Sequence, residues 1–499
     1  MKYQPPPPTN YQQPPPNNYQ QQDYNNSGQQ YNAPSQPPPQ YGYSAPNYDP
    51  NGEKQHFDQT FQVKKPKMND LWAGILFLVV CAGFIAVSVI AFRGYNTNKN
   101  SKNSYAVNAK SGYLIILVIL AAFVLSWGYI FLARLYPKVF IWVSGILNIV
   151  LGIATAILLL VRKQYAGGII AALFAAFTVF AFITWIPRIP FSAFMLTTSI
   201  NVSKKYGHVY LVSLIGGFLA AAFAAWFAAS VAAISVHWGN SSSGTVAGLI
   251  FFMTFAAFWI SEWLKATMQA TISGVYGSWY FCSNNFPKGA TRGAFKRTIT
   301  YSFGSISLGS LITAIVNLLR QLCSIAQNNE AGQGNAAAAM ALCVLGCLLS
   351  ILDWVVNFVN RYAFITIALY GKSYFEAAKA TWSLIKDRGF DALINLCLLG
   401  PVFSMGSVAV GFVCAILAFA YQEFIMDGFG TNGWSFAIVA FAFLIGSQIC
   451  SIMVTPISTG VDTIFVAAAW DPEVLQRDHP DLYAQFLSVY PPLAHAINA

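Results

Sequence analysis

The sequence predicts an all-α, polytopic membrane protein with about ten transmembrane helices and a disordered N-terminal cytosolic tail. Its composition is the first indication, since 56% of the 499 residues are hydrophobic and 9% are charged, whereas soluble globular chains carry about 25% charged residues. The second is a series of continuously apolar runs long enough to cross the hydrocarbon core, which takes about 20 helical residues. These runs lack the alternation of barrel strands. This argues against a soluble enzyme, a coiled coil and, despite a net charge of +10, a nucleic-acid-binding protein, because the basic residues are not clustered.

Residues 1–67 form the expected tail. They hold 14 of the 24 prolines and are otherwise rich in Gln, Asn and Tyr, so they cannot bury enough apolar surface to offset the entropy lost on ordering. No apolar run begins the chain, and we expect no cleavable signal peptide. The helix bundle is expected over residues 71–470, and residues 471–499 are expected to form a cytosolic C-terminal tail.

Ten apolar runs are expected to span the membrane. They cover residues 71–92, 112–132, 139–161, 166–187, 209–234, 247–280, 300–325, 336–359, 390–420 and 434–467. With the N-terminus inside, the cytosolic segments carry 20 Lys and Arg residues and the outside loops carry 6. The excess of basic residues on one side therefore places both termini in the cytosol.

Two segments between the runs, residues 189–205 and 373–388, mix apolar and basic positions without a full span. One interpretation is that each is an interfacial helix with its apolar face on lipid. In the second segment Tyr374, Phe375 and Trp382 would then lie on lipid. The other interpretation is that each segment packs against the cytosolic end of the bundle, and the sequence leaves both open.

Two short motifs indicate a modification and a partner. Asn240-Ser241-Ser242 matches the N-glycosylation pattern and lies in a loop expected outside the cell. Pro38-Pro39-Gln40-Tyr41 is a PPxY motif, and an extended proline-rich segment docks into a WW domain at low entropic cost. A WW-domain ubiquitin ligase is therefore a candidate partner of the tail, although a proline-rich and tyrosine-rich segment also produces such a motif by chance.

A polar stripe runs along the sixth apolar run. It consists of Glu262, Lys265, Gln269, Ser273 and Tyr276, which step by three or four residues and fall within an arc of about 80° on a helix. Because lipid would exclude such a stripe, it is expected to line an aqueous path or to contact another polar helix. The alternative is a structural Glu262–Lys265 pair one turn apart that neutralises itself.

Further candidate pathway residues are Trp259, Arg320, Asp353 and Asp462. Ionisable groups inside a membrane are costly and usually face a bundle interior, a cavity or a partner. Arg320 is expected nearer the outside than Asp353, so a pairing of the two stays open. Asp462 follows Pro456 and is interpreted as a cation or proton site or as a helix cap. Trp259 lies in an aromatic-rich region that suits either a quaternary ammonium ligand or an interfacial belt.

No set of catalytic residues emerges from the sequence. It contains no HExxH, GxSxG, Walker A or dinucleotide-binding motif, and the five histidines are scattered. The cysteines lie in or beside apolar runs without a completing histidine or carboxylate set. We expect no enzymatic activity, no metal and no cofactor.

Four sequence blocks resemble the choline transporter-like family: SGVYGSWY at 273–280, YSFGSISLGSL at 301–311, NRYAFITIALYGK at 360–372 and GVDTIF at 460–465. The short first outside loop and the Pro/Gln-rich tail resemble the fungal pH-nine-sensitive branch of that family. The resemblance implies a ten-helix plasma-membrane transporter with both termini cytosolic. Animal members of the family move choline and related amines, some with proton exchange.

These observations favour a transporter of a small, cationic organic solute such as choline, working by alternating access around a midplane cavity. Its partners would be the solute and the membrane lipids. The expected cation or proton sites are Glu262, Asp353 and Asp462, with Lys265 as a charge partner and Trp259 and Tyr276 as wall residues. The alternatives are a non-transporting scaffold or sensor that acts through its tail, and a channel or lipid scramblase.

Overall fold

The computed structural model describes residues 68–97, 109–161, 165–206, 208–238, 243–283, 286–387, 399–425 and 433–489. The α-helices are α2 (Leu71–Thr97), α3 (Ala109–Leu135), α4 (Pro137–Val161), α5 (Tyr165–Trp185), α6 (Ile189–Lys205), α7 (His208–His237), α8 (Ser243–Phe281), α9 (Ala290–Ile299), α10 (Phe303–Gly332), α11 (Ala336–Tyr370), α12 (Tyr374–Asp387), α14 (Leu399–Ile425), α15 (Gly433–Trp470), α16 (Pro472–Asp478) and α17 (Pro480–Val489). The short 3-10 helix η1 (Ile186–Arg188) joins α5 to α6. The described part of the chain is thus all-α, as predicted.

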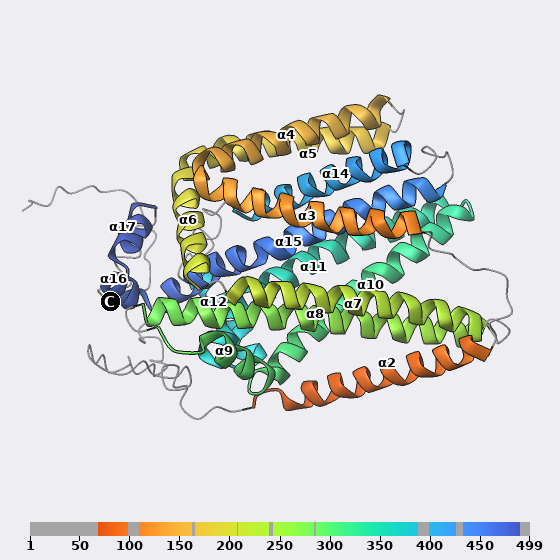
Figure 1. The fold of residues 1–499 in the computed structure, drawn as a ribbon, viewed down its shortest axis with the longest axis horizontal. Coiled ribbons are helices and arrows are strands. Elements are labelled where there is room, and N and C mark those ends of the chain that lie inside the picture. The colour runs from red at the N-terminus through yellow and green to blue at the C-terminus, as the bar shows by residue number, and fades with distance from the viewer. Residues whose placement is uncertain are drawn as a thin grey trace, which may run out of the picture. The chain divides into compact units, whose positions relative to one another are not determined.

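Ten segments of the described chain are long and apolar enough to cross a membrane, which confirms the predicted number. The long helices run side by side (Figure 1). We use two names for the ends of the bundle. The base is the end at which α2 begins and at which α8, α11 and α15 finish. The rim is the opposite end, where the chain passes from α10 to α11. The short helices α6, α9, α12, α16 and α17 gather at the base, on the left of Figure 1.

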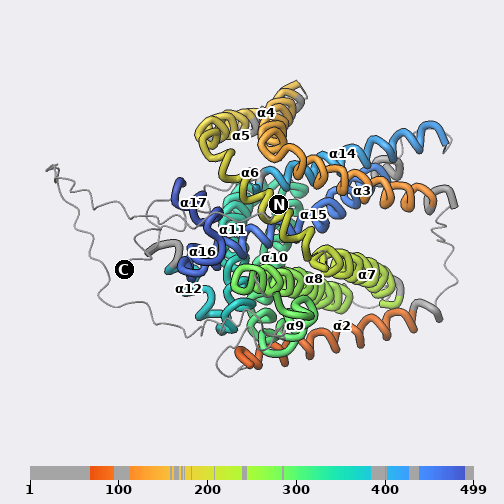
Figure 2. Tube along the Cα trace, turned by 60° about the vertical axis from the view of Figure 1, so that its left-hand side comes forward, coloured from red at the N-terminus to blue at the C-terminus, as the bar shows by residue number. Residues whose placement is uncertain are grey.

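Helix α8 is the central element of the described bundle, since it packs against α7, α10, α11 and α15. The described bundle contains three antiparallel pairs of neighbouring helices: α10 with α11, α14 with α15, and α4 with α5. The α4–α5 pair lies at the edge of the bundle (Figure 2). Apolar surface alone does not drive helices together in lipid, so close approach depends on small residues and on polar contacts between helices.

Two glycines show how close that approach is. A β-carbon on Gly309 of α10 would lie 2.6 Å from ring atoms of both Phe364 and Tyr374, and one on Gly460 of α15 would overlap the ring of Tyr276. Larger residues at these positions would push the helices apart. The small residues of the 301–311 and 460–465 blocks are therefore explained by packing.

Helix α11 continues past the predicted end of its span at residue 359 to Tyr370. Asn360 and Arg361 interrupt the apolar run, which made the segment look finished, but apolar residues resume at once after them. Arg361 therefore lies inside a helix and not in the cytosolic loop to which we assigned it. The helix ends at Gly371, whose positive φ of 63° provides the left-handed C-cap.

The two segments 189–205 and 373–388, for which an interfacial and a packed position were both left open, differ in the structure. Helix α6 runs across the long helices at the base (Figure 1) and packs against α15, α4 and α3, with Met195 and Leu196 fully buried. Helix α12 buries Tyr374 against the bundle and exposes Phe375 and Trp382. The expectation that Tyr374 faces lipid was wrong, because its hydroxyl bonds to Asn360 inside the bundle.

Asp70 joins three elements at the base. Its backbone has a positive φ of 54°, a conformation that Asp tolerates better than most residues. Its Oδ2 accepts hydrogen bonds from the Ser305 hydroxyl at 2.7 Å and from the Tyr374 backbone N–H at 2.8 Å. Next to it, Asn69 donates to the Gly371 carbonyl at 3.0 Å. The carboxylate of Asp70 thus caps the N-terminus of α12, where a negative charge is favourable.

Several predicted features lie outside the described residues. These are the tail motif Pro38, Pro39 and Tyr41 and the glycosylation site Asn240. Within the expected C-terminal tail, the structure describes two short helices, α16 and α17, which we call the hook.

Candidate functional site

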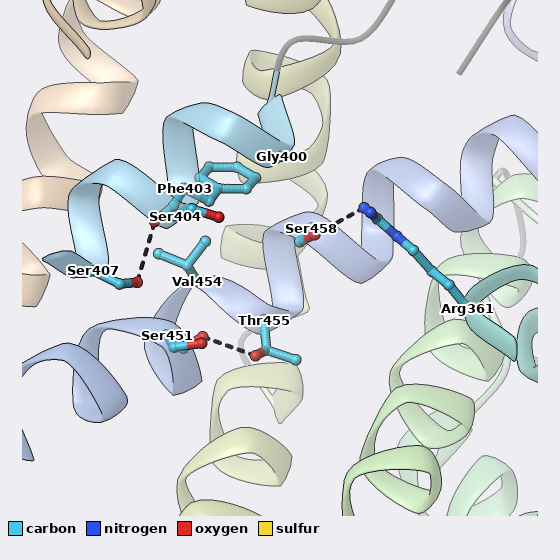
Figure 3. A pocket seen from close by; sticks show the side chains of 9 residues that line it. All are labelled: Arg361, Gly400, Phe403, Ser404, Ser407, Ser451, Val454, Thr455 and Ser458. Carbon is cyan, nitrogen blue, oxygen red and sulfur yellow. Dashed lines mark hydrogen bonds between the residues drawn. The ribbon is translucent and has the colours of Figure 1, made fainter. Parts of the chain in front are cut away.

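A cavity of about 220 Å³ lies between α11, α14 and α15. Five of its nine lining residues carry a hydroxyl group and one carries a charge. The lining consists of Arg361, Gly400, Phe403, Ser404, Ser407, Ser451, Val454, Thr455 and Ser458 (Figure 3). In Figure 3 the side chains of α14 and α15 face each other across it, and Arg361 reaches in from α11. A polar cavity among apolar helices is a natural place for a solute.

Helix α15 supplies one wall of the cavity as a face of hydroxyl groups. Ser451, Thr455 and Ser458 recur every three or four residues and therefore lie on one side of the helix. Thr455 donates to the Ser451 carbonyl at 2.8 Å. Pro456 lies between Thr455 and Ser458, within an unbroken helix, and its missing N–H leaves one backbone carbonyl without its usual helical donor. This wall thus combines side-chain oxygens with a locally weakened helix.

The charged end of the cavity is an ion pair between Arg361 of α11 and Asp462 of α15. Arg361 Nε lies 2.5 Å from Asp462 Oδ2, and its second nitrogen donates to Oδ1 at 2.8 Å. The same guanidinium approaches the Ser458 hydroxyl at 3.4 Å. The Asp462 side chain is 7% exposed, whereas that of Arg361 is 40% exposed. The carboxylate is thus covered and the guanidinium faces the cavity.

This bidentate pair ties α11 to α15 within the bundle. Arg361 lies nine residues before the end of α11, which places it about 14 Å from the base, and Asp462 lies at a similar depth on α15. Removing one member of a buried pair leaves an uncompensated charge and costs about 3–5 kcal/mol. The carboxylate therefore needs either a cation or a proton, and Arg361 is the cation that this structure provides.

Hydrogen bonds of two residues, Gln269 and Asn360, fix the segment of α11 that carries Arg361. Gln269 of α8 donates from Nε2 to the Arg361 carbonyl at 2.7 Å. Asn360, which is buried, donates to the Gly309 carbonyl at 3.1 Å and to the Thr313 hydroxyl at 2.8 Å, and it accepts from the Tyr374 hydroxyl at 2.7 Å. Burial raises the pKa of Tyr374 to about 12, so it remains a donor at neutral pH.

The predicted stripe on α8 does not form one continuous polar surface. Glu262 and Lys265 pair at 3.6 Å, and the Lys265 side chain is 66% exposed. Gln269 contacts α11 as described above, and Ser273 donates to the carbonyl one turn before it, that of Gln269, at 2.8 Å. None of the stripe residues is among the nine that line the cavity. Its role as a pathway stays a prediction.

The two predicted wall residues are fully buried among neighbouring helices. Tyr276 donates to the Ser199 carbonyl at 3.0 Å, and the Ser199 hydroxyl donates to the Ile457 carbonyl at 2.8 Å, so α6, α8 and α15 are joined there. Trp259 donates from its indole nitrogen to the Ser307 carbonyl at 3.0 Å. Both residues therefore hold helices of the bundle together.

Arg320 and Asp353 form an ion pair at 2.6 Å between α10 and α11. We expected them at different depths, but α10 runs on to Gly332, so Arg320 lies further from the rim than the predicted span implied. Asn357 donates to the same carboxylate at 2.8 Å. The side chain of Arg320 is 43% exposed and that of Asp353 18%, so this pair is less enclosed than the one at the cavity.

The structure corrects the sequence interpretation at Asp462 and adds Arg361 as a site residue. The cap interpretation of Asp462 was wrong, because α15 runs without a break to Trp470. Its partner Arg361 was missed as a site residue, although a single arginine with apolar residues on both sides was a usable signal. Within the described ranges, no group of three or more His, Cys, Asp and Glu side chains is placed to hold a metal ion.

Comparison with known proteins agrees with this architecture. Residues 169–473 match the family described as "Plasma-membrane choline transporter". The chain is 52% identical to Protein PNS1 of Gibberella zeae over 480 residues, covering 92% of this chain and 88% of that protein. It is 48% identical to Protein pns1 of Aspergillus fumigatus, with 94% and 91% covered, and 37% identical to Protein PNS1 of Candida albicans, with 92% and 93% covered. The chain is therefore a multi-pass membrane protein that belongs to the choline transporter-like family, in its fungal branch.

Proposed function

We propose that the protein is a plasma-membrane transporter that moves a small, cationic organic solute such as choline by alternating access. The base of the bundle, with both chain termini, would face the cytosol. Family membership supports the transporter class, and the excess of Lys and Arg in the segments assigned inside supports this orientation. The observation that carries the proposal is the Arg361–Asp462 pair at the end of a hydroxyl-lined cavity.

In this proposal the solute exchanges places with Arg361. The pair has no net charge, and Asp462 cannot be left without a cation at low cost. A cationic solute that enters the cavity would take over Asp462, while the exposed guanidinium of Arg361 turns toward the hydroxyl groups of Ser404 and Ser407. Asp462 keeps a cation at each stage, while the occupied site gains one positive charge, which the 40% exposed guanidinium of Arg361 would carry toward water and the hydroxyl groups.

The exchange would couple binding to movement. Arg361 and Asp462 tie α11 to α15, so a solute bound to Asp462 alone removes that tie. Helix α15 is weakened near the same level by Pro456, which gives it a place to bend. Separation of α11 and α15 would then open the cavity on one side, as alternating access requires.

Glu262 and Asp353 are assigned secondary roles in this proposal. Each is already paired with a nearby cation, Lys265 and Arg320 respectively, and neither lines the cavity. We propose them as further cation or proton positions along a path through the bundle, with Lys265 as the charge partner of Glu262. Trp259 and Tyr276 would form its walls.

Uptake of radiolabelled choline into proteoliposomes that contain the full chain tests the proposal. We expect saturable uptake that falls at least tenfold in Asp462→Asn and to a smaller extent in Glu262→Gln. Asp481→Asn, the same chemical change on α17 outside the spans, is the matched control and should keep full activity. Uptake that does not saturate would favour a channel.

A thermal-shift measurement separates the transporter from a scaffold or sensor. The wild-type protein should unfold at a higher temperature with millimolar choline than with sodium chloride at the same ionic strength, because a ligand that binds the folded state stabilises it. If the wild type shows no thermal shift with choline and no choline uptake, choline is overturned as the solute.

We also propose that the tail regulates the amount of protein at the cell surface. The PPxY motif at Pro38, Pro39 and Tyr41 would bind a WW-domain ubiquitin ligase, with Lys54, Lys64 and Lys65 as nearby acceptors. Tyr41→Ala should lengthen the surface lifetime without changing the uptake per molecule. Unchanged turnover would remove the motif from the proposal.

A further inference from the structure

Lys372 lies in a corner formed by two aromatic rings at the base of the bundle. Its Nζ is 4.3 Å from the ring centroid of Trp470 and 5.9 Å from that of Tyr370. The two rings are 6.2 Å apart at an angle of 60°. Gly371, with its left-handed backbone, turns the chain after α11 and so brings Lys372 back over the end of α15. The ammonium group therefore has two ring faces beside it.

A carboxylate completes this corner. The Tyr370 hydroxyl donates to Asp471 Oδ2 at 2.6 Å, and the Tyr280 hydroxyl donates to the Asp471 carbonyl at 2.9 Å. Burial lowers the pKa of Lys372, while the negative charges of Glu376 and Asp471 act in the opposite direction. The ammonium thus loses much of its water and is compensated by rings and carboxylates.

These surroundings also suit a quaternary ammonium cation. A primary ammonium is compact and strongly hydrated, so its desolvation is costly. A quaternary ammonium has no N–H groups to satisfy, and it is recognised by ring faces and a nearby negative charge. The corner of Tyr370, Trp470 and Asp471 offers these features.

The corner also lies between the same two helices as the cavity. Tyr370 ends α11 and Trp470 ends α15, whereas Arg361 and Asp462 join these helices about 12–14 Å further from the base. Ile365, Ile464 and Val466 between the two sites are buried, so a cation that leaves Asp462 toward the base would reach the corner once α11 and α15 separate.

We propose that Tyr370, Trp470 and Asp471 form a second organic-cation site, of the quaternary ammonium class, which Lys372 occupies in this structure as a tethered competitor. The inference rests on the proposed function in that it takes the solute to be an organic cation. Lys372 would keep the site closed until a solute displaces it, and it would return once the solute has left for the base side.

Counting choline molecules per chain tests this site. We would measure equilibrium binding of tritiated choline to the purified full-length protein for the wild type, Lys372→Met and Lys372→Met/Trp470→Leu. Methionine keeps an apolar chain of similar length without the charge. Lys379→Met is the matched control, since this lysine lies on the exposed side of α12, away from the two rings of the corner.

At a choline concentration too low to displace Lys372, the expected result is one additional choline per chain in Lys372→Met, none in Lys379→Met, and loss of the additional choline in the double variant. No gain in Lys372→Met, or a gain that survives Trp470→Leu, would overturn the site. The count at this concentration separates the site from the proposed function: if the cavity binds no choline, the wild type binds none and Lys372→Met still binds one.

A second measurement uses the wild type alone and does not depend on the folding of any variant. Tetramethylammonium chloride should displace Lys372 and raise its rate of modification by an amine-reactive acetylating reagent several-fold, as read by mass spectrometry. The rate at Lys379 should not change, and sodium chloride at the same ionic strength controls for screening. Equal rates with both salts would show that Lys372 is a fixed structural clamp and would overturn the proposal.

Discussion

The two halves of α11 differ in what their polar residues do. The base half consists of residues 360–370. Here Asn360 and Arg361 form hydrogen bonds with four other helices, α8, α10, α12 and α15. Tyr370 bonds to Asp471, directly after α15. In the rim half, residues 336–357, the polar contacts of Asp353 and Asn357 are confined to α11 itself and α10. The apolar side chains of the rim half are largely exposed, as expected of a surface that faces lipid.

The contrast indicates that the base half of α11 is fixed in the fold, whereas its rim half is freer to move. The base half is held from several directions at once, and its ion pair closes one end of a cavity. The polar groups of the rim half bond to one neighbouring helix, so this half can move while fewer hydrogen bonds between helices break. Matched substitutions in the two halves measure whether the difference is energetic as well as geometric.

The largest difference is expected between the two carboxylates. Asp462→Asn removes the partner of Arg361 and should lower stability by about 3–5 kcal/mol, the usual effect of breaking a buried pair, together with uptake. Asp353→Asn breaks a pair whose carboxylate is 18% exposed, against 7% for Asp462, and should cost less. Thermal unfolding in detergent compares them, and equal losses would contradict the contrast.

Two asparagines provide the next comparison. Asn360→Ala removes three buried hydrogen bonds and strands the Tyr374 hydroxyl, so a loss of about 3 kcal/mol is expected at about 1 kcal/mol per bond. Asn357→Ala, one turn nearer the rim, removes hydrogen bonds to a single residue, Asp353, and should cost about 1 kcal/mol. Denaturation midpoints measured side by side give the result, and a larger effect at Asn357 would reverse the assignment.

Glycine substitutions test the packing of the same two regions. Gly309→Ala places a methyl group 2.6 Å from the rings of Phe364 and Tyr374, and overpacking of this kind costs about 1–3 kcal/mol. Gly346→Ala in the rim half meets only the Cys323 sulfur, at 3.8 Å, and should be neutral or stabilising by up to about 1 kcal/mol through helix propensity. Thermal unfolding should show a loss of stability in Gly309→Ala and none in Gly346→Ala; a loss at Gly346 would mean that the rim half is as tightly packed as the base half.

The smallest effect concerns pH and the hook. His479 Nε2 lies 2.9 Å from the Tyr280 carbonyl, and its ring stacks on that of Tyr280. Burial lowers the pKa of His479 from its ordinary value of 6.5, although the Tyr280 carbonyl and Asp478 oppose this. A released hook would therefore bind a proton more readily than the packed one, so packing should weaken as pH falls below about 6.5.

Hydrogen exchange at pH 7.5 and 5.5 measures this weakening. Amides of α17 should exchange faster at the lower pH, after correction for the intrinsic rate, while those of the rim half of α11 should not change. His479→Gln keeps a donor for the Tyr280 carbonyl but does not titrate, so it should abolish the difference. An equal difference in that variant would assign the effect to another group.

Much of the bundle could be predicted because each transmembrane helix is an apolar run that must satisfy its own backbone in lipid. The same criterion failed at α11, since Asn360 and Arg361 ended the run on a hydropathy scale although their partners lie inside the bundle. A polar residue within a span marks a candidate site, but its role becomes clear only when its partner is known. The sequence contains both Arg361 and Asp462, but 101 positions separate them.

The cavity was harder to predict for the same reason. Its residues on α14 and α15 are ordinary serines and a threonine, which often donate to the carbonyl one turn earlier, as Ser407 and Thr455 do here. The hydroxyl face that leads along α15 to Asp462 was visible in the sequence. Which helix lies opposite this face is decided by tertiary packing, and no local pattern records that.

The hydrogen bonds of Asn69 and Asp70 at the base decide where the N-terminus can be truncated without disturbing the bundle. A deletion that stops at residue 67 removes the proline-rich segment and leaves the carboxylate that caps α12 and bonds Ser305. A deletion that extends through Asp70 also uncaps that helix and frees the turn at Gly371. Loss of activity in the longer truncation would then report on α12 and its Tyr374–Asn360 bond, and it would be mistaken for a property of the missing tail.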